Sequence, residues 1–409
     1  MTPVQSDKIF RALEGFTGWL DRYGETSYDH QSYYAGPIGR RAKGLYYRHP
    51  QIGILAVGPM VFSEAFLPAA RRLFWKRMRF PIADAHYAMG FALLFQVTGQ
   101  PGCYRRAVAF LDSLVKTRSP GYGNYCWGYP FDWVTQKGVF PRDTPMITTT
   151  PYAYEAFDTV HSIDGNCAWL DIMNSIAEHA MDDIGDFPLT PQSASSGYYP
   201  GDPIGGVVNA SAYRAALLAD ASVRFREPRY WQRAERFVRF VLDAQQPDGS
   251  WPYEAGGTRD FVDHFHTCFV LKALAKIEKA TSHHGCRLAI DKGVGFYLGA
   301  LFDTDGMPKP FSKAPRLTLY RNELYDCAEA VNIGVLLRGR FPELDRTTDR
   351  VVQVLLDRWQ KKDGSFRSRK LLLGWDNVPM HRWGQSQVFR SLGLYLRSLS
   401  PGEGRSGQG

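Results

Sequence analysis

The sequence lacks any run of about 18 apolar residues, and no charged stretch followed by an apolar one lies near Met1. It therefore predicts neither a membrane-spanning helix nor a secretion signal, and a cytoplasmic protein is expected. The 6 cysteines are scattered without any Cys-x-x-Cys pair, which argues against a disulfide framework and against a cysteine zinc site. Neither a metal nor a cofactor is predicted.

Common nucleotide-binding and catalytic motifs are also missing. There is no Gly-x-Gly-x-x-Gly after a strand, no phosphate-cradling Gly-Lys-Ser/Thr and no Gly-x-Ser-x-Gly elbow. These absences argue against a dinucleotide-binding enzyme, a P-loop nucleotidase and an α/β-hydrolase.

Acidic residues are in deficit, because 49 Lys and Arg against 41 Asp and Glu give a net charge of +8. The basic clusters are Arg71-Arg72, Lys76–Arg79 and Arg367–Lys370. No base-stacking module accompanies them, so nucleic acid is not an expected partner and a solvated face is the simpler interpretation. A weak peripheral membrane contact through Leu73–Lys76 stays open. Oligomeric state is not predicted.

Aromatic residues, in contrast, are abundant at 14%, with 10 Trp and 22 Tyr. Such a content suits a cleft that binds flat apolar faces, such as sugar rings or isoprenoids, although large cores also use aromatic side chains.

An acidic-glycine turn recurs at a fixed period. Asp248-Gly249, Asp305-Gly306 and Asp363-Gly364 are 57 and 58 residues apart. A step of 62 residues back from Asp248 reaches Gly185-Asp186, and Trp127–Tyr129 lies about one further period earlier. Self-similarity at this spacing predicts a repeat architecture.

Between these turns, apolar residues recur at helical spacing. The predicted helices are residues 9–23, 83–97, 103–116, 151–161, 166–184, 207–225, 230–245, 262–279, 287–301, 324–338, 344–359 and 381–399. Short and long connections alternate, and the sequence therefore predicts an all-α (α/α)6 toroid of about six helical hairpins with its long loops on one rim. An open solenoid is the alternative, but neither end carries a polar capping repeat.

We predict three regions along the chain. Residues 1–80 form an N-terminal helix and an irregular, aromatic-rich segment that packs on the toroid, residues 81–400 form the toroid, and residues 401–409 are a disordered Gly- and Ser-rich tail. Residues 24–50 are expected to be a loop. Residues 52–70 are expected to hold only short helical pieces, because Gly53, Gly58, Pro59 and Pro68 interrupt them.

Inner-helix starts and long loops should converge on a central cavity, so titratable residues there are candidates for catalysis. Asp263 is expected to cap a helix, and one of His264 and His266 to face the cavity as a proton shuttle. Histidines at i and i+2 point to different sides of a helix, which argues against a two-histidine zinc site. A capping aspartate with a packed histidine is the structural alternative.

Tyr325 and Glu329 are four residues apart and share a helix face. A tyrosine and a carboxylate in one cavity can serve as base and acid on a sugar, and Glu329 with Asp263 would suit glycoside hydrolysis. Ion pairing with Arg321 or Arg382 is the alternative. The predicted substrate-binding residues are Trp127, Tyr129, Asp132, Trp133, Tyr199, Asp202, Trp251, Asp326, Asp376, His381, Arg382, Trp383 and Gln385. Core packing or a closed lid is the alternative for these.

Four motifs together resemble a known family: Tyr125–Trp133, the Asp-Gly-Ser-Trp turn at 248–251, Asp263–Thr267 and Arg382–Gln385. The family is the α/α-toroid proteins of bacterial exopolysaccharide and capsule loci, to which the VpsJ-like polysaccharide biosynthesis proteins belong. The resemblance covers roughly residues 45–400. It implies a six-hairpin toroid that works on a glycan or its precursor, and it implies no mechanism.

The turn at 245–251 is also similar to that of squalene-cyclase and prenyltransferase toroids. The zinc ligands and the acid motif of those enzymes have no counterpart here.

Three hypotheses follow. The first is a carbohydrate-active enzyme of bacterial polysaccharide biosynthesis, a hydrolase, lyase or sugar epimerase, that cleaves or modifies an acidic or neutral glycan by general acid/base catalysis. The second is a non-catalytic glycan-binding or scaffold subunit of the synthesis machinery. The third is an isoprenoid cyclase or prenyltransferase-like toroid, which requires a dry cavity without charged walls.

Overall fold

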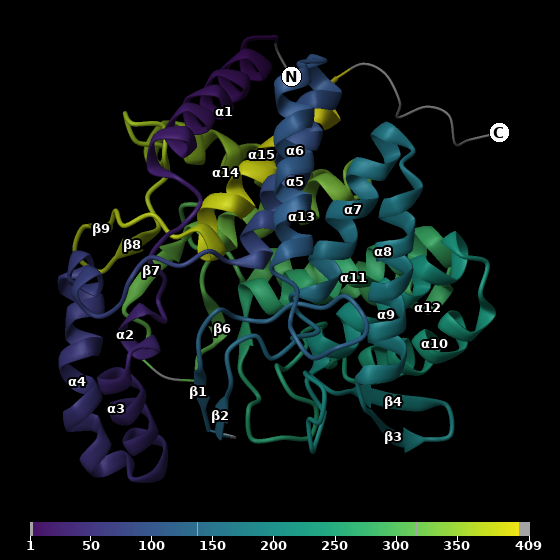
Figure 1. Ribbon diagram of the computed structural model, residues 1–409, viewed down its shortest axis with the longest axis horizontal. Helices are drawn as coiled ribbons and strands as arrows, with labels where there is room; N and C mark the ends of the chain where they lie inside the picture. The colour runs from purple at the N-terminus through teal and green to yellow at the C-terminus, as the bar shows by residue number, and fades with distance from the viewer. Residues whose placement is uncertain (1–2, 137, 316, 401–409) are drawn as a thin grey trace.

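The computed structural model describes residues 3–136, 138–315 and 317–400, and most of them are helical (Figure 1). The predicted disordered tail, residues 401–409, lies outside the described residues.

Six of the described helices form an inner ring. They are apolar on nearly all sides; in α5, every residue from Pro81 to Leu94 is buried. A helix with this pattern has to be surrounded by other elements. The inner helices are α5 (Pro81–Thr98), α7 (Thr150–Asp164), α9 (Val208–Arg224), α11 (His264–Thr281), α13 (Leu324–Leu336) and α15 (Ser386–Leu399).

A second set of helices covers this ring from outside, and these helices bury one face only. Short connections join each inner helix from α5 to α13 to the next outer helix, and Gly99 and Gly165 end α5 and α7 in the left-handed conformation that favours glycine. The outer helices are α1 (Pro3–Tyr23), α6 (Pro101–Lys116), α8 (Cys167–Glu178), α10 (Pro228–Asp243), α12 (His284–Ala300) and α14 (Pro342–Val354).

The ring is closed by direct packing of α15 on α5. The Phe91 and Phe389 rings are 4.8 Å apart, and a Cβ placed on Gly90 would lie 2.5 Å from the Phe389 ring. The helices can approach this closely because Gly90 has no side chain. The predicted all-α toroid is therefore confirmed, and the open-solenoid alternative is not what the chain adopts.

The three acidic-glycine turns share one backbone hydrogen bond, from the glycine N–H to the carbonyl three residues earlier at 2.9–3.0 Å, and the turns at Asp248 and Asp363 share further bonds. Asp248 and Asp363 each accept hydrogen bonds from the backbone N–H and the hydroxyl of the serine two residues later, at 2.7–3.0 Å. The glutamine before each turn, Gln245 or Gln360, donates to a carbonyl of the turn and to a carbonyl of the adjacent outer helix. All three turns lie on outer-to-inner connections, so they share one rim as predicted.

These turns also place α1 in the ring. The turn at Gly249 packs on α12, the turn at Gly306 on α14, and the turn at Gly364 on Gly15 of α1. Helix α1 thus takes the sixth outer position, next to α14. The division of the chain at residue 80 stays a prediction.

This packing predicts unequal effects of adding one methyl group at two equivalent turns. Gly364 has φ +97°, and a Cβ there would lie 2.1 Å from the Gly15 carbonyl oxygen; Gly306 has φ +74°, and its Cβ would meet the flexible Arg350 side chain. We expect Gly364→Ala to cost at least about 2 kcal/mol and Gly306→Ala about 1 kcal/mol, because only the first forces backbone to move. Urea unfolding measures both, and equal losses would contradict the proposed packing.

The long connections carry small antiparallel sheets. Two hairpins, β1–β2 and β3–β4, lie along the lower edge in Figure 1. The strands are β1 (Trp133–Thr135), β2 (Gly138–Phe140), β3 (Asp186–Thr190), β4 (Ser193–Ser196), β5 (Val262–Asp263) with β6 (Phe311–Lys313), and β7 (Tyr320–Glu323) with β8 (Arg369–Leu371) and β9 (Trp375–Asp376).

Residues 24–80 differ from the prediction, because they are largely helical. They form α2 (Ser32–Ala35), α3 (Pro37–Arg48), α4 (Pro50–Phe66) and the 3₁₀ helix η1 (Pro68–Leu73), and the α3–α4 hairpin projects at the lower left of Figure 1. Pro59 is tolerated inside α4. Gly53 lets α4 cross α3 closely, since a Cβ there would lie 2.2 Å from the Tyr46 Cα. Gly53 is therefore a packing position, and Pro59 lies on the exposed side of a continuous helix.

Candidate functional site

Aromatic and imidazole rings from several long connections and inner-helix starts meet at the rim. The Tyr325 and Trp383 rings are 4.5 Å apart, Phe265 lies 5.6 Å from Trp383, and Tyr253 lies 4.7 Å from the His266 ring. Arg382 lies over Tyr129 and Trp383 at 4.7 and 5.0 Å. We call the following residues the central cluster: Tyr129, Tyr253, Phe265, His266, Tyr325 and Trp383.

Asp263 and His266 form a dyad in this cluster. Asp263 caps α11, as predicted: one carboxylate oxygen accepts from the His266 backbone N–H at 2.9 Å and the other lies 2.7 Å from Nδ1 of His266. Asp263 is 2% exposed, whereas the His266 side chain is 18% exposed. A carboxylate at Nδ1 holds the proton there and leaves Nε2 as an acceptor, which is the arrangement of a general base.

His264 points away from the mouth. Its Nε2 lies 2.9 Å from the Tyr297 hydroxyl and its Nδ1 3.6 Å from Asp326, and it is fully buried. Burial lowers the pKa of His264 to about 3, so the imidazole is neutral. The structure therefore makes His264 the packed histidine and leaves His266 as the one at the rim.

Asp326 is buried beside His264, and within the described residues neither of its carboxylate oxygens has a hydrogen-bond partner. Burial, reinforced by the nearby carboxylates of Glu323 and Asp263, raises the pKa of Asp326 well above its usual range. These effects favour the neutral acid form of Asp326, and its buried carboxyl group has no surface through which it could contact a sugar.

Glu329 and Tyr325 are deeper than the prediction required. Glu329 is fully buried and pairs with Lys272 at 2.5 Å, and Lys272 also donates to the Tyr152 hydroxyl at 3.1 Å. Tyr325 is 2% exposed, and burial raises its pKa well above 10, which disfavours a role as base. The geometry brings Tyr325 into the cluster and leaves Glu329 beneath it.

Further charged groups lie between the inner helices. Glu155 pairs with Lys276 and, at 2.8 Å, with Arg390, which also lies 3.5 Å from Nδ1 of His86. Burial alone would raise the pKa of Glu155, but Lys276 and Arg390 outweigh it and hold the value at about 2. This charged interior does not fit the dry, uncharged cavity that an isoprenoid cyclase requires.

Trp383 owes its position to an irregular helix start. The π-helical turn η4 (His381–Gln385) precedes α15, and Gly384 in it has φ +132°, a conformation that L side chains rarely adopt. Trp383 remains half-buried. Trp383 itself is non-helical, with φ −116° and ψ 64°, so the chain is kinked at this position.

Arg382 is neutralised by Asp29, a residue that the sequence analysis did not select. The Arg382 guanidinium donates to both Asp29 carboxylate oxygens at 2.9 and 2.5 Å, and Asp29 is fully buried. Burial would raise the pKa of Asp29, but Arg382 holds it below its usual value. The predicted cationic platform for an acidic sugar is therefore an internal ion pair with an aromatic face beside it.

A second charged group borders the cluster and was also missed. His30 lies 3.1 Å from Glu323 and 3.5 Å from Glu64, and Arg369 bonds to both carboxylates at 2.6 and 2.8 Å. The His30 ring is 5.9 Å from Trp383. The members come from four distant parts of the chain, so no local sequence signal links them.

Several predicted binding residues serve the fold. Trp127 and Trp251 are buried and donate their indole N–H groups to the carbonyls of Leu114 and Val241. Gln385 bonds to both backbone groups of Phe366. The two buried groups Asp376 and His381 are likewise bonded to protein, namely to Arg71 and to Tyr87 and Gly24.

The loop residues divide into two kinds. Asp132 accepts from the Arg142 N–H of its own loop and pairs with Arg40 of α3, and Asp202 accepts from the Tyr198 N–H, so both carboxylates hold their loops in place. Trp133 and Tyr199 are half-buried; Trp133 lies 5.6 Å from Tyr129. Of the predicted binding residues, these two rings remain, with Tyr129 and Trp383, as stacking surfaces.

His381 predicts a pH-dependent stability. Its Nδ1 lies 2.6 Å from the Tyr87 hydroxyl and its Nε2 2.9 Å from the Gly24 carbonyl, and burial lowers its pKa to about 3. Between pH 6.5 and that value the unfolded chain binds a proton that the folded chain does not, so folding stability falls on acidification. The free energy of unfolding that His381→Gln loses relative to the wild type should therefore shrink by about 2–3 kcal/mol from pH 7.5 to pH 4.5. Urea unfolding at both pH values measures it, and a constant deficit would contradict a neutral His381.

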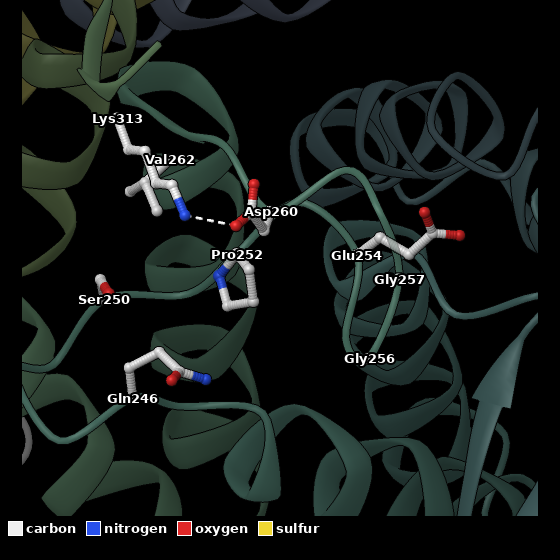
Figure 2. Close-up of a pocket in the computed structure, with 9 residues that line it drawn as sticks. All are labelled: Gln246, Ser250, Pro252, Glu254, Gly256, Gly257, Asp260, Val262 and Lys313. Atoms are coloured by element: carbon white, nitrogen blue, oxygen red, sulfur yellow. Dashed lines mark hydrogen bonds and ion pairs between the residues drawn. The ribbon is translucent and has the colours of Figure 1, made fainter. Parts of the chain in front are cut away.

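A separate pocket of about 280 Å³ lies between the α10–α11 and α12–α13 connections (Figure 2). Its lining includes Gln246, Ser250, Glu254, Asp260 and Lys313, and the last two pair across it. It contains no imidazole, no aromatic ring and none of the predicted site residues. We therefore place the candidate site at the central cluster. Nowhere in the described residues do three His, Cys, Asp or Glu side chains form a metal-binding group.

No protein-family model and no curated protein sequence matches the chain. Its structure is similar to unsaturated glucuronyl hydrolase from Bacillus sp. GL1, with a TM-score of 0.61 and 12% identity over 95% of this chain and 96% of that one. It is also similar to cellobiose 2-epimerase from Bacillus thermoamylovorans B4167 (TM-score 0.59, 9% identity, 78% and 88% of the chains). A third similar structure is the GH76 α-mannanase BT2949 of Bacteroides thetaiotaomicron (TM-score 0.56, 8% identity, 78% and 86% of the chains). At these identities the likeness defines the class, an (α/α)6-toroid protein.

Proposed function

We propose that this chain is a carbohydrate-active enzyme in which His266, oriented by Asp263, transfers protons to and from a sugar bound at the central cluster. The observation that carries the proposal is the dyad itself: an imidazole with a carboxylate at Nδ1 and a partly exposed ring, bordered by Tyr253 and Phe265 at 4.7 and 4.3 Å. Aromatic faces bind the apolar faces of sugar rings. The glycan-processing names of the structural neighbours support the substrate class.

The state of the carboxylates favours proton transfer at a carbon over hydrolysis by two carboxyl groups. Both oxygens of Asp263 are bonded to His266, Glu323 pairs with Arg369, and Glu329 pairs with Lys272. Most glycoside hydrolases use two carboxyl groups that flank the glycosidic bond. A base that removes a proton from a sugar carbon, and an acid that returns one, needs only the imidazole and a second proton donor. Epimerisation or elimination is therefore our proposed reaction class.

We further propose that the substrate belongs to bacterial polysaccharide biosynthesis and that the enzyme acts in the cytoplasm. The support for this setting is the resemblance of the four sequence motifs to the exopolysaccharide and capsule proteins. Because Arg382 and Arg369 are already paired with carboxylates, a neutral sugar fits the cluster at least as well as an acidic one.

Incubation in D₂O with a panel of neutral and uronic-acid disaccharides, followed by NMR, tests the proposal. We expect deuterium at one sugar carbon, together with an epimer or an unsaturated product. Release of a free sugar without deuterium at carbon would overturn the reaction class and indicate hydrolysis. Calorimetric binding of a glycan without exchange or product would instead indicate a non-catalytic glycan-binding subunit.

A further inference from the structure

The α3–α4 hairpin and η1 expose an unusual amount of apolar surface. More than half of the exposed large hydrophobic residues of the described chain, 9 of 17, lie between residues 38 and 73. We call them the apolar face: Ile38, Ile52, Ile54, Leu55, Val61, Phe62, Phe66, Leu67 and Leu73. Single exposed hydrophobic residues are ordinary, but Leu55, Phe62 and Phe66 recur at helical spacing on one side of α4, with the two phenylalanine rings 4.9 Å apart, and such a set marks an interaction surface.

Helix α4 buries small residues and exposes large apolar ones, which is the reverse of what a typical surface helix does. Its covered side is made by small or medium residues, among them Gly53, Val57 and Met60, that pack in a small core with Tyr33 and Ala42. Its outer side carries Leu55 at 78% and Phe62 at 58% exposure. A helix that turns its large apolar side chains outward loses free energy in water, so the face requires a partner.

The charge around this face identifies the partner. Residues 32–79 hold 9 of the 49 Lys and Arg residues but only 1 of the 41 Asp and Glu residues, namely Glu64. The rest of the chain holds 40 basic and 40 acidic residues. This segment therefore supplies the entire net charge of +8. Glu64 points inward to Arg369 and His30 and does not reduce the positive charge of the outer surface.

Four of the cations are exposed: Arg41, Arg48, Arg72 and Lys76. In the described part of the chain none of the four has an ion-pair partner. Arg41 and Arg48 lie on α3, in the hairpin that projects from the toroid (Figure 1), and Arg72 and Lys76 lie within or just after η1, so cations occur on both sides of α4 in the sequence. Large apolar side chains bordered by unpaired cations are complementary to the interface of an anionic lipid bilayer.

We propose that the α3–α4 hairpin with η1 docks this protein on an anionic membrane surface. The apolar face enters the boundary between headgroups and acyl chains, while the four cations contact lipid phosphates. The contact is interfacial, because every described helix falls short of what a bilayer span requires. This proposal does not rest on the proposed function, since the residues that carry it lie outside the central cluster.

Co-sedimentation with vesicles tests it, using phosphatidylcholine alone and phosphatidylcholine with 30% phosphatidylglycerol. We expect the wild-type protein to bind the anionic vesicles at least tenfold more tightly, and binding to weaken as salt rises. Leu55→Asp/Phe62→Asp and, separately, Arg48→Glu/Arg72→Glu should each lower binding tenfold or more. The matched control is Leu189→Asp/Leu288→Asp, which changes two exposed leucines of the toroid (58% and 56% exposed) and should leave binding unchanged.

Hydrogen exchange of the wild-type protein gives a second readout that does not depend on any variant. Anionic vesicles should protect residues 37–73 and leave the toroid unaffected. Equal binding to neutral and anionic vesicles, or equal loss in the control variant, would overturn the proposal. A dimer in solution that Leu55→Asp/Phe62→Asp splits into monomers, with no vesicle binding by the wild type, would overturn it in favour of a second copy.

Discussion

Replacing His266 with Gln is expected to lower turnover by about 10²–10⁴-fold, the usual contribution of a general acid/base group. Glutamine retains a polar side chain of similar length but cannot exchange a proton near neutral pH. Because His266 is partly exposed and its backbone N–H still bonds to Asp263, the variant should fold normally. Epimer or unsaturated product, and deuterium incorporation in D₂O, measure the loss.

Asp263→Asn tests the effect of the Asp263 carboxylate on His266 without removing the cap of α11. Asparagine still caps α11, but it no longer stabilises the imidazolium that forms when Nε2 takes a proton. We expect about a tenfold to hundredfold loss in kcat with little change in KM, because the negative charge acts mainly in the transition state. The matched control is His284→Gln, an exposed histidine at the start of α12 whose replacement should leave turnover unchanged. Full activity in both His266→Gln and Asp263→Asn would remove the dyad from the mechanism.

The sequence was most informative where the chain repeats itself. The acidic-glycine turns share a backbone hydrogen bond, and each joins an outer helix to the next inner one, so their period in the sequence reflects the repeat of the toroid. The Asp263 cap was also predictable, because an N-cap bond is made within three residues. These features are predictable because the residues that form them are close together in the sequence.

Side-chain direction in the long loops could not be predicted in this way. Trp127 and Tyr129 are two residues apart in one aromatic stretch, yet Trp127 is fully buried and Tyr129 lies in the cluster. No helical or strand period assigns a face in an irregular segment. For the same reason the sequence does not distinguish Trp251 from Trp383, although Trp251 is buried and only Trp383 of the two lies in the central cluster.

The charged partners of the site were hidden for a different reason. His30 and Glu323 are separated by 293 residues, and Arg382 and Asp29 by 353. Each pair exists only because the N-terminal segment returns to the last inner helices when the ring closes. The prediction of a loop at residues 24–50 and of short helical pieces at residues 52–70 is wrong, because Gly53 permits close packing of α4 on α3 and Pro59 is accommodated on the exposed side of α4.

The same segment depends on one ion pair, whose removal should have the largest effect on stability. Arg71 in η1 donates to Asp376 at 2.6 Å, and both side chains are fully buried. Its second terminal nitrogen lies 2.8 Å from the Met380 sulfur, and Asp376 also accepts from the Val378 N–H at 3.0 Å. Loss of one partner leaves an uncompensated charge in the interior, which costs about 3–5 kcal/mol.

We therefore expect Arg71→Met and Asp376→Asn each to lower the free energy of unfolding by about 3–5 kcal/mol in urea, and Arg71→Met/Asp376→Leu to recover part of that loss. The matched control is Lys8→Met at the exposed Lys8–Asp357 pair (46% and 42% exposed), which should cost under about 1 kcal/mol. Because Tyr33, Ala42, Val57 and Met60 form a small core of their own, the loss should appear first as proteolysis within residues 24–80. A single cooperative transition with unchanged proteolysis would show instead that the hairpin and the toroid unfold together.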